Sequence, residues 1–195
     1  HKMKLFVRSP LPMAVSIAGF LASPAMGQWS ATIVHPPGAY ASEIRAVALG
    51  GQAAGSLKPS FSEDYHAAMW NGLGSSWGDL GVGGGIVGMT PSQQVGSFLG
   101  HASLWSGTQA SRIELYNGPS VAYGITGGQQ VGYASIGGEY RAALWAGSAG
   151  SFVNLNPSGA IRSEALATDG MPQWGGAVFV GPNGQFGRAL RWTGV

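Results

Sequence analysis

The chain contains no cysteine among its 195 residues. This excludes disulfides, thiolate metal sites and a cysteine nucleophile. The fold must therefore be held together by burial of apolar surface and by hydrogen bonds.

Charge is also scarce, because Asp, Glu, Lys and Arg together make up 9% of the residues. The formal net charge is +2, but three of the ten basic residues (Lys2, Lys4 and Arg8) lie in the first 27 positions. Without that segment, seven basic residues face eight acidic ones, a net charge of −1. No basic patch remains to attract phosphates, so the composition argues against nucleic-acid binding.

Long apolar runs are missing except near the N-terminus. Met3, Lys4 and Arg8 precede a short apolar stretch at residues 11–22, and Ala25 and Gly27 are the small residues of a cleavage site. This pattern is typical of a secretory signal peptide, and the stretch is too short to span a membrane. We predict that residues 1–27 are a signal peptide, in which His1 and Lys2 are a remnant that precedes the starting Met3. The expected location is secreted or periplasmic in a bacterium, without a membrane span.

Glycine, in contrast, is abundant at 34 residues, and it marks a four-fold internal repeat. Each copy begins with a Gln-containing segment that ends in glycine, at residues 50–55, 92–96, 127–132 and 171–176. A short apolar run follows and closes at Trp70, Trp105, Trp145 or Trp192. Ten residues after each of the first three tryptophans comes a leucine: Leu80, Leu115 and Leu155.

A repeat of about 40 residues with several short strands is the signature of a propeller. In the third copy we expect strands at residues 121–125, 129–134, 140–145 and 151–155, and a corresponding set in each other copy. The repeat tryptophans are expected to fill the space between neighbouring sheets. The sequence thus predicts an all-β, four-bladed β-propeller as a single domain over residues 28–195.

The last copy lacks its leucine strand, and the matching piece stands at the other end of the chain. Residues 31–39 (ATIVHPPGA) align with residues 152–160 (FVNLNPSGA). We therefore expect the N-terminal strand to close the last blade, because closing the ring removes free strand edges. The alternatives are a piece of a longer array and two chains that complete a larger ring. A closed ring would be a monomer.

The repeat resembles a known pattern, in which G-G-Q-x-V-G is followed by H-A-x-L-W-x-G and then D-L. The clearest matches are residues 93–96 with 101–107, residues 129–132 with 141–147, and residues 66–71 with 79–80. Over about residues 29–195, the chain is similar in this pattern to the HAF-type repeats of bacterial extracellular proteins. The resemblance implies a secreted, propeller-like module and brings no catalytic residues with it.

Histidine does not indicate a metal site in this chain. His66 and His101 occupy one repeat position, which is Arg141 and Arg188 in the other copies. Since arginine cannot replace a metal ligand, we expect no metal and no cofactor. These residues are instead expected to bond a backbone carbonyl or the polar residue of the fourth strand, such as Asp79 or Glu114.

Two sets of residues are candidates for a site. Glu43 and Glu164 stand at equivalent repeat positions and could approach each other across the junction of the first and last blades. Tyr40 and the long loop over residues 58–65 are expected to form a polar and aromatic patch. From that loop Lys58, Glu63, Asp64 and Tyr65 are the candidate binding residues.

These residues favour a protein- or glycan-binding or structural module with an unidentified partner. The alternative is a carbohydrate-active hydrolase or lyase with an axial site near Glu43 and Glu164, because such enzymes use paired carboxylates.

Overall fold

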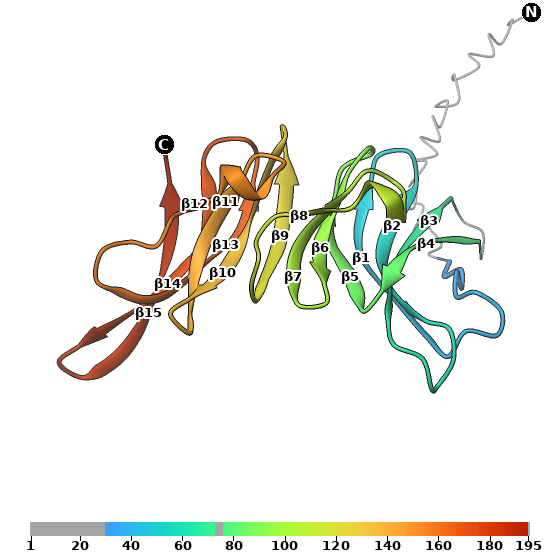
Figure 1. Ribbon diagram of the computed structural model, residues 1–195, viewed down its shortest axis with the longest axis horizontal. Coiled ribbons are helices and arrows are strands. Elements are labelled where there is room, and N and C mark those ends of the chain that lie inside the picture. Colours follow the sequence, from blue (N-terminus) through green and yellow to red (C-terminus); the bar gives the residue numbers. More distant parts are fainter. Residues whose placement is uncertain (1–29, 73–75, 195) are drawn as a thin grey trace, which may run out of the picture. The chain divides into compact units, whose positions relative to one another are not determined.

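A computed structural model describes residues 30–72 and 76–194 of the chain. The predicted signal peptide lies outside the described residues. The fold is all-β, with four antiparallel sheets that follow one another in sequence (Figure 1). Among the described residues there is no α-helix, only two 3-10 turns, η1 (Gln109–Ser111) and η2 (Ala149–Ser151).

Each repeat of the sequence forms one sheet. The first contains β1 (Ala41–Ala48), β2 (Gln52–Lys58), β3 (His66–Asn71) and β4 (Trp77–Val82). The second contains β5 (Gly84–Met89), β6 (Gln94–Phe98), β7 (His101–Trp105) and β8 (Ile113–Glu114). The third contains β9 (Ser120–Thr126), β10 (Gln129–Ile136), β11 (Glu139–Trp145) and β12 (Val153–Asn154). The fourth contains β13 (Ala160–Thr168), β14 (Gln173–Gly181) and β15 (Gly184–Trp192). The strands predicted for the third repeat are confirmed, although β12 is shorter than expected.

The first two strands of every sheet meet at a glycine. Gly55, Gly96, Gly132 and Gly175 each lie so close to the first strand that a Cβ atom would collide with a backbone carbonyl there. Beside each of these contacts the ladder register shifts, as in a β-bulge. Because only glycine fits at such a contact, these four positions define which residues of the repeats are equivalent.

This equivalence corrects the alignment of the repeat glutamines. Gln94, Gln130 and Gln173 lie opposite Trp105, Trp145 and Trp192 in their ladders. The first sheet has Ala53 at this position, opposite Trp70. Alignment of the repeats by sequence alone matches Gln173 with Gln52, Gln93 and Gln129. Each of these three residues precedes the true equivalent of Gln173 by one position.

A hydrogen bond explains why a polar glutamine is buried in the second and third sheets. The Oε1 atom of Gln94 accepts the Gly107 N–H at 2.9 Å, and that of Gln130 accepts the Gly147 N–H at 2.8 Å. Gln94 and Gln130 therefore each satisfy the turn that follows the third strand, whereas Gln173 donates to Gln129 Oε1 and to the Gly170 carbonyl, both at 3.3 Å.

The core is made between successive sheets. Met69 packs with Ile86 and Trp105 of the second sheet, and Leu104 packs with Trp145 of the third. Leu144 packs with Ala165 of the fourth sheet. Trp70, Trp105 and Trp145 are almost fully buried. The prediction that the repeat tryptophans fill the space between sheets is confirmed for the second and third sheets.

The closing strand expected at the N-terminus is not formed in the structure. Residues 30–36 carry no secondary structure, and the fourth sheet contains three strands within the described part of the chain. The turn that follows is nevertheless the one predicted by the alignment with residues 152–160. His35 contacts Ser42 Oγ at 2.7 Å and the Ala39 carbonyl at 2.9 Å, as Asn156 contacts Ser163 Oγ and the Ala160 carbonyl. Residues 35–39 are therefore anchored on the first sheet, and this anchoring does not depend on the pairing of residues 31–34.

Candidate functional site

The first sheet carries an exposed aromatic cluster around a lysine. The Nζ atom of Lys58 lies 5.6 Å from the ring centroids of Tyr40 and Phe61 and 5.7 Å from that of Tyr65. Tyr40 and Phe61 meet edge to face, with centroids 5.3 Å apart. All three rings are exposed, by 48% in the case of Tyr65. We call Tyr40, Lys58, Phe61 and Tyr65 the aromatic patch.

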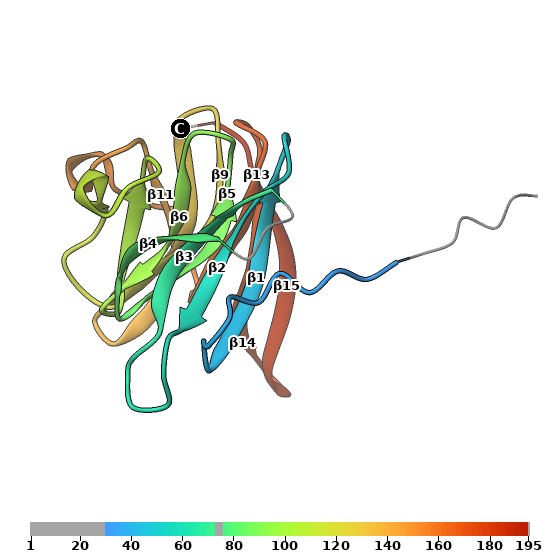
Figure 2. The ribbon, with the colours of Figure 1, turned by 90° about the vertical axis from the view of Figure 1, so that its right-hand side faces the viewer.

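Backbone hydrogen bonds position this patch. The Tyr40 N–H donates to the Lys58 carbonyl at 2.9 Å, which holds the start of β1 against the end of β2. The Tyr65 carbonyl accepts the Gly83 N–H at 2.7 Å. The loop between β2 and β3, which carries Phe61, projects beyond the strands it joins (Figure 2). Two of the three rings thus stand next to fixed backbone.

A polar pocket of about 370 Å³ adjoins the patch. Its lining consists of Ala41, Ser42, Glu43, Arg45, Ser56 and Tyr65. Glu43 Oε2 and Arg45 Nη2 form an ion pair at 3.0 Å, with both side chains about half exposed. An exposed pair of this kind contributes little to stability, so these two groups are available to hydrogen-bond a ligand. Tyr65 belongs to both the pocket and the patch.

The expected pairing of Glu43 with Glu164 is not observed. Glu164 lines a different pocket, of about 570 Å³, on the fourth sheet, together with Arg162, Leu166 and Arg188 and a floor of small residues. The two glutamates are equivalent in the repeat, since Glu43 lies opposite Ser56 and Glu164 opposite Gly176. Equivalence in the repeat therefore does not bring the two carboxylates into one site.

The other predicted residues fall into two groups. Tyr40, Lys58 and Tyr65 come together as expected, and the structure adds Phe61, Ser56 and Arg45 to them. Glu63 and Asp64 are exposed in the β2–β3 loop and are not part of the pocket lining. Phe61 could have been found from the sequence as an aromatic residue in a polar loop.

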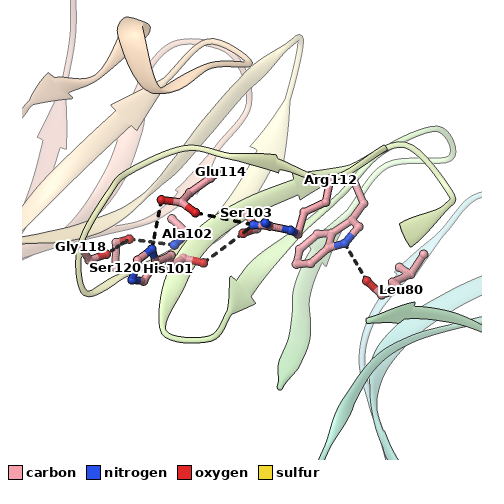
Figure 3. Close-up of polar contacts among 9 residues, drawn as sticks. Leu80, His101, Ala102, Ser103, Arg112, Glu114, Gly118 and Ser120 are labelled. Atoms are coloured by element: carbon pink, nitrogen blue, oxygen red, sulfur yellow. Dashed lines mark hydrogen bonds and ion pairs between the residues drawn. The ribbon is translucent and has the colours of Figure 1, made fainter. Parts of the chain in front are cut away.

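His66 and His101 contact the polar residue of the fourth strand, as expected. His66 Nδ1 lies 2.9 Å from Asp79 Oδ2. The equivalent His101 Nδ1 lies 3.1 Å from Glu114 Oε1 (Figure 3). Arg141 donates to two backbone carbonyls in the fourth sheet instead. Over residues 30–72 and 76–194 there is no group of three or more side chains that could hold a metal ion.

A cluster of tyrosines lies next to the fourth-sheet glutamate. Tyr133 stacks on Tyr140 with centroids 4.3 Å apart, and Tyr123 lies 5.9 Å from Tyr133. Burial raises the pKa of Tyr123 to about 12, and the nearby charge of Glu164 adds to the effect. Tyr123 is thus held as a neutral phenol well above neutral pH.

Comparisons with known proteins identify no relative. No family model, no curated protein sequence and no solved structure matches this chain. In the part of the chain that the structure describes, no helix has the length and apolar character needed to cross a membrane.

Proposed function

We propose that the protein is a secreted module of propeller-type repeats that binds a glycan through the first sheet. The observation that carries this proposal is the position of Tyr65, which forms one wall of a polar pocket and one ring of the aromatic patch. Glycan sites combine these two features, because sugar rings present apolar C–H faces as well as hydroxyl groups.

The chemistry of the site suits such a ligand. The exposed rings of Tyr40, Phe61 and Tyr65 offer surfaces for stacking, and aromatic side chains provide large contact area at a low entropic cost. The carboxylate of Glu43 accepts hydrogen bonds from sugar hydroxyls, and the guanidinium of Arg45 donates them. A volume of about 370 Å³ is at the lower end for ligand pockets, which suits a short saccharide.

Two further elements of the proposal rest on the sequence. The N-terminal pattern supports export, and the resemblance to HAF-type repeats supports four blades of a propeller. Sheet packing in chain order, from the first to the fourth, agrees with the propeller arrangement.

The positions of the carboxylates favour ligand binding over hydrolysis. A glycosidase places two carboxyl groups about 5–10 Å apart on either side of one bond. Glu43 and Glu164 line different pockets, and the ionic partner of Glu43 is Arg45. We therefore assign Glu43 a role in ligand binding.

The test is calorimetric titration of the full chain with oligosaccharides selected on a glycan array. Replacing Tyr65 with alanine should raise Kd about 2- to 12-fold, since one ring contact contributes about 0.5–1.5 kcal/mol. Glu43→Gln should weaken the same interaction. Tyr140→Ala is the matched control, because Tyr140 is similarly exposed but lies on the third sheet. If the folded chain binds no glycan, or binds one equally well in both site variants, the proposal is wrong.

A further inference from the structure

The connectors between sheets dock in a repeated way. After the second sheet, the Leu115 N–H donates to the Ala102 carbonyl at 2.8 Å. The Ala102 N–H in turn donates to Ser120 Oγ at 2.7 Å (Figure 3). After the third sheet, the Leu155 N–H donates to the Ala142 carbonyl at 2.8 Å, and the Ala142 N–H donates to Ser163 Oγ at 2.9 Å. One alanine of the third strand thus receives both ends of the connector that leads to the next sheet.

A segment that precedes the first sheet has the spacing and the turn of these connectors. Val34 and Ser42 are eight residues apart, as are Leu155 and Ser163. The turn between them has the same internal contacts, because His35 holds Ser42 Oγ as Asn156 holds Ser163 Oγ. Residues 34–42 therefore have the conformation of a docked connector at the Ser42 end.

The fourth sheet has an alanine at the position that would accept this segment. Ala189 is the equivalent of Ala102 and Ala142, since it lies opposite Gly176 as they lie opposite Ser97 and Tyr133. In the other sheets this alanine directs its N–H and its carbonyl away from the second strand, toward the connector. The structure shows β15 largely exposed, with a pocket of about 570 Å³ on the face that includes Ala189.

The surface around Ala189 is shaped to receive backbone. The pocket floor is made of small residues: Gly175, Gly176, Ala177, Gly187 and Ala189. The complementary outer face of β1 exposes Ile44 by 40% and Val47 by 73%, whereas Ile86 and Ala122, the equivalents of Ile44 in the second and third sheets, are fully buried. The face of β15 and the outer face of β1 are thus both left uncovered, and charged residues (Arg162, Glu164 and Arg188) surround the small-residue floor of the pocket.

We propose that residues 34–42 dock on β15 of the same chain, with the Val34 N–H bonded to the Ala189 carbonyl and the Ala189 N–H bonded to Ser42 Oγ. Residues 32–34 then form the fourth strand of the fourth sheet, and Ile33 lies opposite Leu190. The same chain is the partner because the contact continues an interface made twice within it, and tethering raises the effective concentration. The inference rests on the propeller arrangement proposed above and does not depend on the ligand.

The absence of cysteine allows a direct test by introduced cysteine pairs in the full chain. Ile33 and Leu190 correspond to Glu114 and Ser103, which face each other between β8 and β7. By the same pattern they form a non-hydrogen-bonded pair, in which side chains approach most closely. The double variant Ile33→Cys/Leu190→Cys should therefore form an intramolecular disulfide under mild oxidation, detected by peptide mapping and by non-reducing electrophoresis.

Two controls define the outcomes. Ser103→Cys/Glu114→Cys should form a disulfide in any folded chain, and Ile33→Cys/Gly187→Cys, three residues out of register, should not. A disulfide-linked dimer would show that the connector docks on a second copy, and free thiols beside an oxidised positive control would show that it does not dock at all. Either result overturns the proposal and leaves glycan binding untouched.

Amide hydrogen exchange on the unmodified chain gives a second, independent readout. The amides of Val34 and Ala189 should be protected as strongly as those of Leu115 and Ala102. Fast exchange at both sites in the folded protein would also contradict the docking.

Discussion

Ser163 accepts a hydrogen bond from the Ala142 N–H at 2.9 Å, and this contact joins the fourth sheet to the third. Its hydroxyl also donates to Asn156 Oδ1 at 2.6 Å. Ser163 is 2% exposed, so its hydroxyl is shielded from water and depends on these two partners.

Replacing Ser163 with alanine should lower the free energy of unfolding by about 1–3 kcal/mol, because it leaves buried polar groups without partners. Ser158→Ala, at an exposed position of the same connector, should have little effect. The urea midpoints of the two variants measure the difference. Equal midpoints would mean that the buried hydroxyl does not support the junction.

Gly132 is required by a close approach of backbone rather than by its own dihedral angles. A Cβ atom there would collide with the Val121 carbonyl. Gly132→Ala should therefore cost about 1–3 kcal/mol, comparable to overpacking a core, and lower Tm by several degrees. Gly150→Ala is the control, because a Cβ atom at that position would meet no atom within 4 Å and the backbone there is not left-handed. A calorimetric scan that shows the same Tm for both would contradict the assigned contact.

Gln130 is fully buried, and it accepts from Gly147 while donating to the Gly128 carbonyl at 2.9 Å. Gln130→Glu keeps the shape but replaces the donor with a buried carboxylate, which is costly when charged. The variant should be strongly destabilised at pH 7 and should partly recover at pH 4–5, where the carboxyl group is protonated. Gln109→Glu, at an exposed position, should show no such recovery in urea titrations at the two pH values.

Tyr123 makes the stability depend on pH in the alkaline range. Its pKa is raised from 10.0 to about 12, so the folded state holds the phenolic proton more tightly than the unfolded state. The stabilising contribution is fully present below pH 10 and is lost as the pH rises from about 10 to 12. Tyr123→Phe removes this contribution, so its urea midpoint should fall less steeply than that of the parent chain over this range. Tyr65→Phe serves as the control, and parallel curves for the parent and Tyr123→Phe would refute the assignment.

The candidate site was predictable only where neighbours in space are also neighbours in sequence. Lys58 and Tyr65 belong to one hairpin, and Tyr40 begins the adjacent strand, so their grouping follows from strand order. The proposed approach of Glu43 and Glu164 depended instead on how the first and fourth sheets are placed. The structure puts these residues in separate pockets.

By itself, the sequence determined the number of sheets, the order of strands in the first three sheets and the burial of Trp70, Trp105 and Trp145, because these follow from local alternation and from the spacing of glycine turns. Tertiary structure decided the register of the glutamines. The buried glutamine must lie opposite the tryptophan on the neighbouring strand, where its side chain reaches the turn that follows that tryptophan. It also decided that Gly55, Gly96, Gly132 and Gly175 must be glycine. That requirement arises from a backbone carbonyl on a neighbouring strand, and no pattern within a single strand records it.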